Sequence, residues 1–285
     1  MSQIFPTRQW IVIGAAAIAI LVMNASAADT VSTGISLDRG FSYLYDLDFP
    51  RAHESFLSWQ EQHPENPLGP VCDAAGLLFA EFNRLGVLES QFYQDDRAFD
   101  ARPKLAPDPA VRDRFNAELQ QAESRATSQL AKDPKDHDAL FAMTLSSGLR
   151  ADYAALIEKR NLAALRYTKT ATTWAEQLLA VDPECYDAHL ATGVSQYLVG
   201  SMAAPLRWLV RLGGVSGDKE AGIRDLQLTA ERGHYLAPFA RILLAIAYVR
   251  DKDKPRAKEL LIALRDEFPE NPLFTREITR LNTAR

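Results

Sequence analysis

The chain contains little cysteine, no block of basic residues and no long apolar run beyond its first residues. Only Cys72 and Cys185 are present, and two distant cysteines cannot supply the disulfide framework of a small secreted domain. Two buried thiols are the simplest interpretation, and a single disulfide is the alternative. The formal net charge of −5 argues against a nucleic-acid partner, because domains that bind nucleic acid carry basic patches.

Runs of alternating apolar and polar residues rich in Val, Ile and Thr are also missing, although they are typical of half-buried strands. Apolar residues recur at helical spacing instead. Residues 255–268 begin with a proline that suits the first turn of a helix, and Pro269 ends the pattern. Four residues of this segment share one apolar face: Ala257, Leu260, Leu261 and Leu264. The sequence therefore predicts an all-α fold.

The first residues are typical of a secretory signal peptide. Arg8 supplies a positive charge, Trp10–Met23 form an apolar run of suitable length, and small residues end at Ala27. The run is short for a membrane span, which needs about 20 residues, so an uncleaved anchor is the less favoured alternative. We predict a signal peptide over residues 1–27, cleaved after Ala27, a periplasmic or secreted location, and one helical domain over residues 28–285.

Prolines at the ends of predicted helices divide the chain into units. Alignment on Pro64 and Pro269 gives two windows of about 34 residues, 33–66 and 238–271, that match in detail. Each window has a small residue, an aromatic, an alanine, a large apolar residue and a closing proline. These are Gly40, Tyr43, Ala52, Phe56 and Pro64 in the first window, and Ala245, Tyr248, Ala257, Leu261 and Pro269 in the second.

These windows resemble the tetratricopeptide repeat (TPR), a helix–turn–helix unit in which a small residue on the first helix lets the second approach. The middle of the chain matches less closely. Its predicted helices cover residues 71–93, 110–133, 137–149, 161–182, 186–198 and 218–233. The resemblance implies a TPR-like α-solenoid of about five helix hairpins, with insertions at about 94–109 and 200–217 and a capping helix near 274–281.

Few residue patterns in the chain are typical of chemistry. The histidines have no partner at metal-ligand spacing, and His137 begins a predicted helix, where exposure is the ordinary outcome. Ser216–Lys219 match the S-x-x-K pattern of serine acyl-enzymes, but the companion motifs are missing, so a turn and helix N-cap are the simpler interpretation. We predict no catalytic residue, no metal and no cofactor, and hence a protein that is not an enzyme.

The first helices of a TPR array line a concave groove, and the resemblance places apolar residues there. They are Phe41, Tyr45, Phe141, Leu145, Tyr197, Phe239 and Ile246. Leaving such side chains in water costs about 1.5–3 kcal/mol each, so the groove must be covered. An apolar partner segment or lipid, a second copy of the chain, and the chain's own insertions are the three alternatives; the last closes the array into a globule.

The insertion at 200–217 is apolar and carries Arg207, Trp208 and Arg211 on a short amphipathic segment. It either folds back over the groove or docks a partner or a membrane surface. Residues 200–250 resemble a segment of tetratricopeptide repeat protein 39 and the outer-membrane Iml-type family, in which a proline-containing apolar insert also leads into a helix start with Gly and Asp. That resemblance implies an adaptor-like protein without enzymatic activity.

The predicted function is therefore an exported scaffold that mediates protein–protein interaction through the groove and the Trp208 insertion. The alternative is a periplasmic helical protein that binds a small ligand or lipid and serves a transporter. The sequence leaves the partner and the oligomeric state open.

Overall fold

The computed structural model describes most of the chain: residues 36–88, 105–202, 204, 207–208 and 216–283. The chain divides into two units, Met1–Gly34 and Ile35–Arg285, and the described residues all belong to the second. These residues form helices and turns and contain no strand, so the predicted all-α class is confirmed. In this part of the chain, no helix combines the length and the apolar character needed to cross a membrane. The predicted signal peptide lies outside the described residues.

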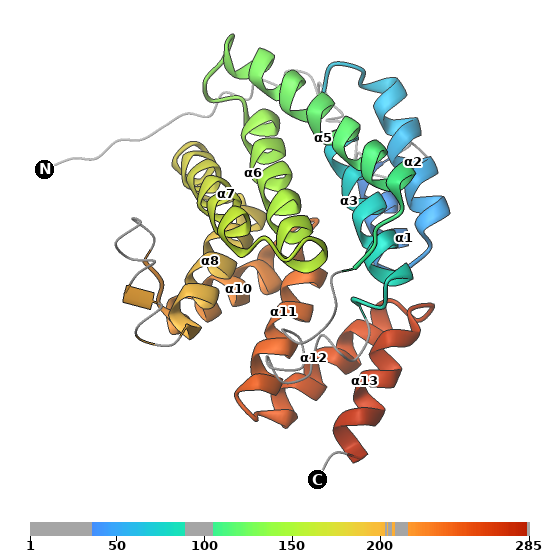
Figure 1. Ribbon diagram of the computed structural model, residues 1–285, viewed down its shortest axis with the longest axis vertical. Coiled ribbons are helices and arrows are strands. Elements are labelled where there is room, and N and C mark those ends of the chain that lie inside the picture. Colours follow the sequence, from blue (N-terminus) through green and yellow to red (C-terminus); the bar gives the residue numbers. More distant parts are fainter. Residues whose placement is uncertain (1–35, 89–104, 203, 205–206, 209–215, 284–285) are drawn as a thin grey trace, which may run out of the picture. The chain divides into compact units, whose positions relative to one another are not determined.

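The N-terminal half of this unit contains five of the described helices, each packed against the next (Figure 1). They are α1 (Leu37–Tyr45), α2 (Phe49–Gln62), α3 (Leu68–Arg84), α5 (Pro109–Leu130) and α6 (His137–Asp152). A π-helical turn, Tyr153–Ile157, follows α6 directly. Helix α3 also packs against α6, so the helices form two layers here.

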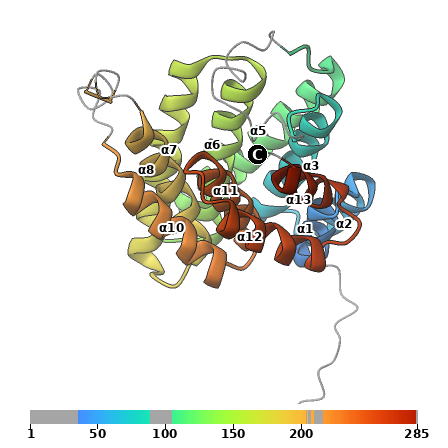
Figure 2. The ribbon, with the colours of Figure 1, turned by 90° about the horizontal axis from the view of Figure 1, so that it is seen from below.

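The C-terminal half continues the same pattern of consecutive packing (Figure 2). Its helices are α7 (Asn161–Val181), α8 (His189–Ser201), α10 (Lys219–Arg232), α11 (Ala237–Arg250), α12 (Lys254–Glu267) and α13 (Pro272–Thr283). One 3-10 turn, Tyr186–Ala188, precedes α8. Helix α13 agrees with the predicted capping helix near 274–281.

The hairpins α1–α2 and α11–α12, which make up most of the two matching windows, have the same turn between their two helices. In each, one residue has a left-handed backbone, Leu47 with φ 62° and Lys252 with φ 63°. The amide of the next residue, Asp48 or Asp253, donates to the carbonyl five residues earlier at 2.8 Å in both hairpins. This is the Schellman ending of a helix, which normally has glycine at the left-handed position. Both hairpins form it without glycine.

The second helices of these hairpins also begin alike. The carboxylate of Asp48 accepts a hydrogen bond from the backbone N–H of Arg51, and that of Asp253 from Arg256, so each aspartate is an N-cap. The guanidinium group of each arginine then lies over a tyrosine of the preceding helix, 4.8 Å from the ring of Tyr43 and 5.6 Å from that of Tyr248. The similarity of the two windows therefore extends from sequence to side-chain contacts.

The small residue of each window lies where its two helices pack most closely. A Cβ atom at Gly40 would lie 2.6 Å from Cδ1 of Phe56, so the glycine makes room for the aromatic ring. In α11–α12 the equivalent pair is Ala245 and Leu261, both fully buried. The smaller leucine side chain leaves space for the methyl group of the alanine.

Helix α3 is shorter than the predicted helix at 71–93. It ends at Arg84 because Gly86 adopts a left-handed backbone with φ 70°. The amide of Val87 donates to the carbonyl of Phe82 at 2.8 Å, which is again the Schellman ending. The prediction was wrong here because Gly86 was included in the helix. Residues 89–93 lie outside the described part.

Only the end of the predicted insertion at 94–109 is described. Its backbone packs on α3, where the amide of Asp108 donates to Oε1 of Glu81 at 2.7 Å and Arg84 donates to the carbonyl of Ala106 at 3.3 Å. The bond from Arg84 lowers the pKa of Glu81. This segment therefore covers the outer end of α3 before α5 begins.

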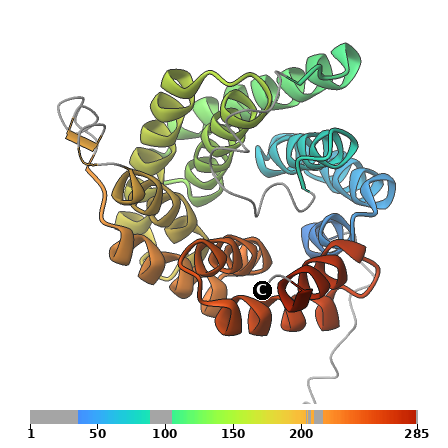
Figure 3. The same ribbon diagram turned by 60° about the horizontal axis from the view of Figure 1, so that its bottom comes forward.

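The end of the first helix, α1, contacts the turn that precedes the last helix, α13 (Figure 3). Nδ2 of Asn271 donates to the carbonyl of Tyr45 at 2.8 Å, and the ring of Tyr45 lies 5.3 Å from that of Phe268. The amide of Glu270 also donates to Oδ1 of Asp46 at 3.2 Å. These contacts join the turn before α13 to the end of α1, so segments from the start and the end of the helical unit meet here.

Candidate functional site

The predicted groove residues lie on the first helices of the hairpins, and the structure buries most of them. Five have at most 9% of their surface exposed, and two are half-buried. The buried ones are Phe41 and Tyr45 on α1, Phe141 on α6, Tyr197 on α8 and Ile246 on α11; the half-buried ones are Leu145 on α6 and Phe239 on α11. The chain's own side chains therefore cover this wall.

Tyr235, in the turn between α10 and α11, supplies much of that cover. Its ring stacks on Phe41 with centroids 4.9 Å apart and on Phe141 with centroids 6.4 Å apart. The hydroxyl of Tyr45 donates to the carbonyl of Tyr235 at 2.8 Å. One turn residue thus connects α1 and α6 across the interior. Of the three predicted alternatives, the chain's own cover is the one observed, but it comes from a short connection between α10 and α11 and not from an insertion.

Asp187 holds the turn in place from the α7–α8 connection. Its carboxylate is buried and accepts the backbone N–H of Tyr235 at 2.9 Å and that of Leu236 at 3.1 Å. Burial raises the pKa of Asp187, while the two backbone donors oppose that shift by stabilising the charged form. The position of the Tyr235 ring therefore depends on a carboxylate 48 residues earlier in the chain.

The insertion at 200–217 leaves and rejoins the unit at one narrow base. A Cβ atom at Gly217 would lie 2.7 Å from the backbone N of Gly200, and one at Gly200 would lie 2.7 Å from the carbonyl carbon of Asp218. Because glycine has no side chain, the backbone at Gly200 and the backbone at Gly217 can lie in contact. Asp218 then caps α10 by accepting the amide of Ala221 at 2.9 Å, as the N-cap interpretation of the S-x-x-K segment predicted.

Trp208 points away from the interior. The guanidinium group of Arg207 donates to the carbonyl of Gly200 at 3.0 Å, which ties this part of the insertion to its base. The next residue, Trp208, is 61% exposed. Arg211 lies outside the described residues. Trp208 therefore does not cover the predicted groove residues. Among the predicted partner residues that the structure describes, it is the most exposed to solvent.

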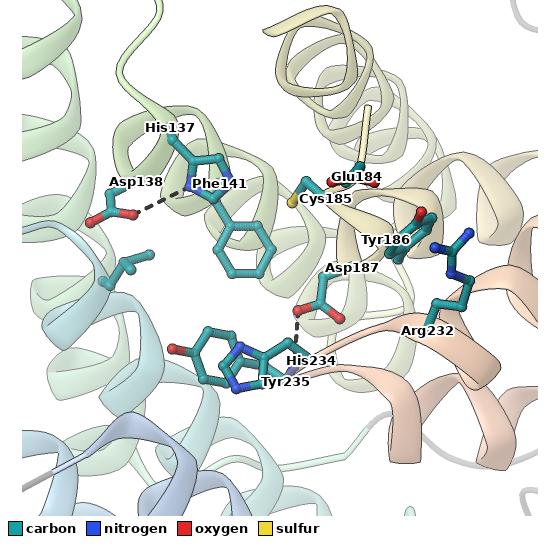
Figure 4. Close-up of a pocket in the computed structure, with 11 residues that line it drawn as sticks. His137, Asp138, Phe141, Glu184, Cys185, Tyr186, Asp187, Arg232, His234 and Tyr235 are labelled. Carbon is teal, nitrogen blue, oxygen red and sulfur yellow. Dashed lines mark hydrogen bonds and ion pairs between the residues drawn. The ribbon is translucent and has the colours of Figure 1, made fainter. Parts of the chain in front are cut away.

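A cavity of about 260 Å³ opens between the start of α6, the α7–α8 connection and the α10–α11 turn (Figure 4). Its lining combines apolar and ionisable side chains: Leu68, His137, Asp138, Phe141, Glu184, Cys185, Tyr186, Asp187, Arg232, His234 and Tyr235. Phe141 and Tyr235 belong to both the cavity and the buried wall. Of the predicted groove residues, Phe141 is the one that lines this cavity.

His137 is the first residue of α6 and stands between two carboxylates. Its Nδ1 lies 3.4 Å from Oδ1 of Asp138, and its Nε2 lies 3.3 Å from Oδ2 of Asp182. The hydrogen bond with Asp138, followed by the contact with Cys185, raises the pKa of His137 to about 10. The same histidine lowers the pKa of Asp138. These contacts therefore favour the protonated form of the imidazole.

Cys185 reaches the same place from the α7–α8 connection. It is a half-buried free thiol, whereas Cys72 is a buried free thiol on α3 whose pKa burial raises. The predicted alternative of a disulfide between them does not occur in the structure. Donor atoms of His137, Cys185 and Asp182 all lie within 4.8 Å of one another. These three residues carry the ligand types that divalent transition metals prefer.

On the opposite side of the cavity, the basic side chains contact neighbouring residues. The guanidinium group of Arg232 lies 4.0 Å above the ring of Tyr186, and His234 stacks on Tyr235 at 4.2 Å. Nε2 of His234 is 2.6 Å from Oδ1 of Asp38. Arg232 and His234 are therefore held by neighbouring side chains on this side of the cavity, and His137 and Cys185 lie at its other edge.

Sequence reasoning missed this edge because its members lie far apart in the chain. From the sequence, His137 was expected at an ordinary exposed helix start and Cys185 was expected to be one of two buried thiols. Two short signals were present: Asp136–Asp138 surround a histidine with acids at a helix start, and Asp182–Cys185 form a proline turn with two donor residues. Neither signal alone predicts a site.

Comparison with models of known protein families gave no match. Comparison with curated protein sequences also gave no significant match.

Proposed function

We propose that this chain is an exported, TPR-like helical scaffold that binds a protein partner and has no catalytic role. The repeat assignment is supported by the hairpins α1–α2 and α11–α12, which share the left-handed turn residue, the aspartate N-cap and the arginine above a tyrosine. The contacts between Asn271 and Tyr45 favour an array whose ends meet rather than an open horseshoe.

The observation that carries the binding proposal is the exposure of Trp208. An indole held in water at 61% exposure forgoes part of the roughly 1.5–3 kcal/mol that burial of a large apolar side chain provides. Tryptophan and arginine are enriched among the residues that dominate binding energy at protein interfaces. The chain covers most of the predicted groove residues, whereas Trp208 is an exposed residue of the predicted partner surface. Arg207 anchors that surface to Gly200.

Site-specific photo-crosslinking in the full-length chain tests this proposal. A photoreactive phenylalanine analogue at position 208 should give a discrete protein adduct in cells, and the same analogue at Leu57 on α2, which is 36% exposed, should give none. Unmodified chain in excess should suppress the adduct, and the Trp208→Ala chain should not. Equal adducts at both positions, or lipid adducts alone at 208, would contradict a protein partner.

The cavity favours a second function, the binding of a small ligand. Its volume of about 260 Å³ lies at or below the lower end of the roughly 300–1,000 Å³ of typical ligand pockets. The size suits a small molecule better than a lipid. Native mass spectrometry of the purified chain should detect a bound small molecule if this function is correct, and the Phe141→Trp variant, which fills the cavity, should lose it.

The export proposal has a separate test. Sequencing the N-terminus of the protein recovered from cells should give Ala28 as the first residue. Recovery of a chain that still begins at Met1 would contradict cleavage.

A further inference from the structure

The turn at the end of α7 presents two donor side chains in a defined geometry. The amide of Cys185 donates to the carbonyl of Asp182 at 3.2 Å, and the amide of Glu184 donates to its side-chain Oδ1 at 3.0 Å. Oδ1 is thereby occupied, and Oδ2 turns toward α6. A tight turn that places two ligands three residues apart is the arrangement found in many zinc sites.

His137 completes the cluster from a different element. Its Nε2 lies 3.3 Å from Oδ2 of Asp182, and the donor atoms of His137, Asp182 and Cys185 lie within 4.8 Å of one another. Around a tetrahedral zinc ion, bonds of about 2.0–2.3 Å place neighbouring ligand atoms about 3.3–3.7 Å apart. Small side-chain rotations would therefore bring all three atoms to bonding distance.

An outer layer of hydrogen bonds orients the histidine. Asp138 faces the other ring nitrogen, Nδ1, with Oδ1 at 3.4 Å, and its Oδ2 accepts a hydrogen bond from Nδ2 of Asn66 at 2.7 Å. A carboxylate on the far nitrogen of a histidine is the usual support of a metal-bound imidazole, because it fixes the ring and increases its basicity. This support comes from α6 and from the turn before α3, independently of the ligands in the α7–α8 connection.

We propose that His137, Asp182 and Cys185 bind one Zn²⁺ ion at the edge of the cavity. The thiolate and imidazole exclude Mg²⁺ and Ca²⁺ as preferred ions, since those bind through oxygen ligands. Three protein ligands leave one tetrahedral position, and His137 and Cys185 both line the cavity. That position faces a space where water or a small donor molecule reaches the ion. The site goes beyond the proposed scaffold function and does not depend on it.

Titration of the purified, chelator-treated full chain with Co²⁺ tests the proposal directly. Co²⁺ in place of zinc should produce sulfur-to-metal charge-transfer absorption and the strong visible bands of a tetrahedral site, saturating at one ion per chain. Zn²⁺ should then remove these bands by displacing Co²⁺. The Cys185→Ser variant should lose the charge-transfer band, whereas the Cys72→Ala variant, which removes the other thiol, should keep it.

Competition with a zinc chelator gives the affinities. Cys185→Ser and Asp182→Asn should each weaken Zn²⁺ binding by more than about 100-fold, and Asp138→Asn by about 10–100-fold, the range seen for outer-layer partners. His63→Gln alters an exposed histidine outside the cluster and should leave affinity unchanged. Far-ultraviolet circular dichroism checks that each variant folds; Cys185 and Asp182 are only partly buried, so these two variants should fold.

Three outcomes would overturn the proposal. They are the absence of saturable binding in the unaltered chain, binding that survives in both Cys185→Ser and Asp182→Asn, and a charge-transfer band that disappears in Cys72→Ala instead. Retention of copper but not of zinc at equal concentrations would overturn the assignment to zinc.

Discussion

The hairpins α1–α2 and α11–α12 have the same internal contacts but contact different neighbouring elements. Both close with a left-handed residue followed by an aspartate N-cap, and both end in a turn whose asparagine accepts the amide two residues later: Asn66 from Leu68 at 2.9 Å, and Asn271 from Leu273 at 3.0 Å. The side-chain amide of Asn66 donates to Asp138 on α6, whereas that of Asn271 donates to the backbone of Tyr45 on α1.

The difference shows how one local motif serves two purposes. The shared contacts stabilise each hairpin. The side-chain nitrogen of the asparagine then donates to a neighbouring element and links the hairpin to it. At Asn66 the link supports the histidine of the proposed zinc site. At Asn271 the link joins the last hairpin to the first. We expect mutations of shared positions to act alike in both hairpins and mutations of linking positions to act differently.

Asn271→Ala should have the largest effect. Asn271 is buried, and its loss removes the bond to Tyr45 and leaves the amide of Leu273 without its side-chain acceptor. An orphaned buried group costs about 1–3 kcal/mol, so we expect the free energy of unfolding in urea to fall by about 3 kcal/mol. The matched variant Asn282→Ala, at an exposed asparagine paired with Lys258, should change it by less than about 0.5 kcal/mol. Equal effects would mean that the two ends of the unit do not depend on this contact.

Gly40→Ala should rank second, with a loss of about 2 kcal/mol, because the new methyl group overlaps the ring of Phe56. The comparison with Ala245 and Leu261 also predicts the remedy. Adding Phe56→Leu recreates the pair found in α11–α12, so the double variant should be more stable than Gly40→Ala alone.

A second glycine supplies the control for this experiment. Gly148 lies on α6 with no atom near the place of a Cβ, so Gly148→Ala should stabilise the protein by up to about 1 kcal/mol. Calorimetric unfolding of Gly40→Ala, Phe56→Leu, the double variant and the Gly148→Ala control measures the coupling between Gly40 and Phe56. Purely additive effects would contradict the close packing at this position.

These hairpins also mark how far sequence reasoning reaches. Helix starts at prolines and the apolar face with Ala257 follow from local spacing, because one helical turn places residues on one face. The close approach of two helices at Gly40 was instead expected from the resemblance to TPR units. The end of α3 near Gly86 was not predicted, although this glycine is present in the sequence. A single glycine inside an apolar pattern is compatible with a continuing helix or with a Schellman ending, and only the burial of Val87 in the folded chain favours the second.

The candidate site was harder to predict than the fold. The predicted groove residues were chosen from the TPR resemblance, but the side chain that stacks on Phe41 and Phe141, Tyr235, lies in a turn and is held there by Asp187. The cluster of His137, Asp182 and Cys185 likewise joins the start of α6 to the α7–α8 connection, two segments that are far apart in the chain. Contacts of this kind depend on tertiary packing, which local periodicity does not encode.

Asn66→Ala should have a smaller effect than Asn271→Ala. Asn66 is only half-buried, so water can replace part of what its side chain provides, and Asp138 retains His137 as a partner. We expect a loss of about 1 kcal/mol in the free energy of unfolding. A loss equal to that of Asn271→Ala would show that linkage to α6 matters as much as contact between the ends of the unit.

Lys252→Gly should have the smallest effect, and it should be stabilising. Lys252 is exposed and has a φ of 63°, a conformation that glycine adopts without steric penalty and that normally favours glycine at this position of a helix ending. We expect a gain of about 0.5 kcal/mol, reduced from the full steric benefit because glycine also makes the unfolded chain more flexible. Leu47→Gly relieves the same conformation but removes a half-buried side chain, so its gain should be smaller or absent. Thermal unfolding of both variants beside Gly86→Ala, which imposes the left-handed strain where glycine now avoids it, would measure the effect in three turns. A loss of stability in Lys252→Gly would mean that the lysine side chain makes a contribution larger than the strain it carries.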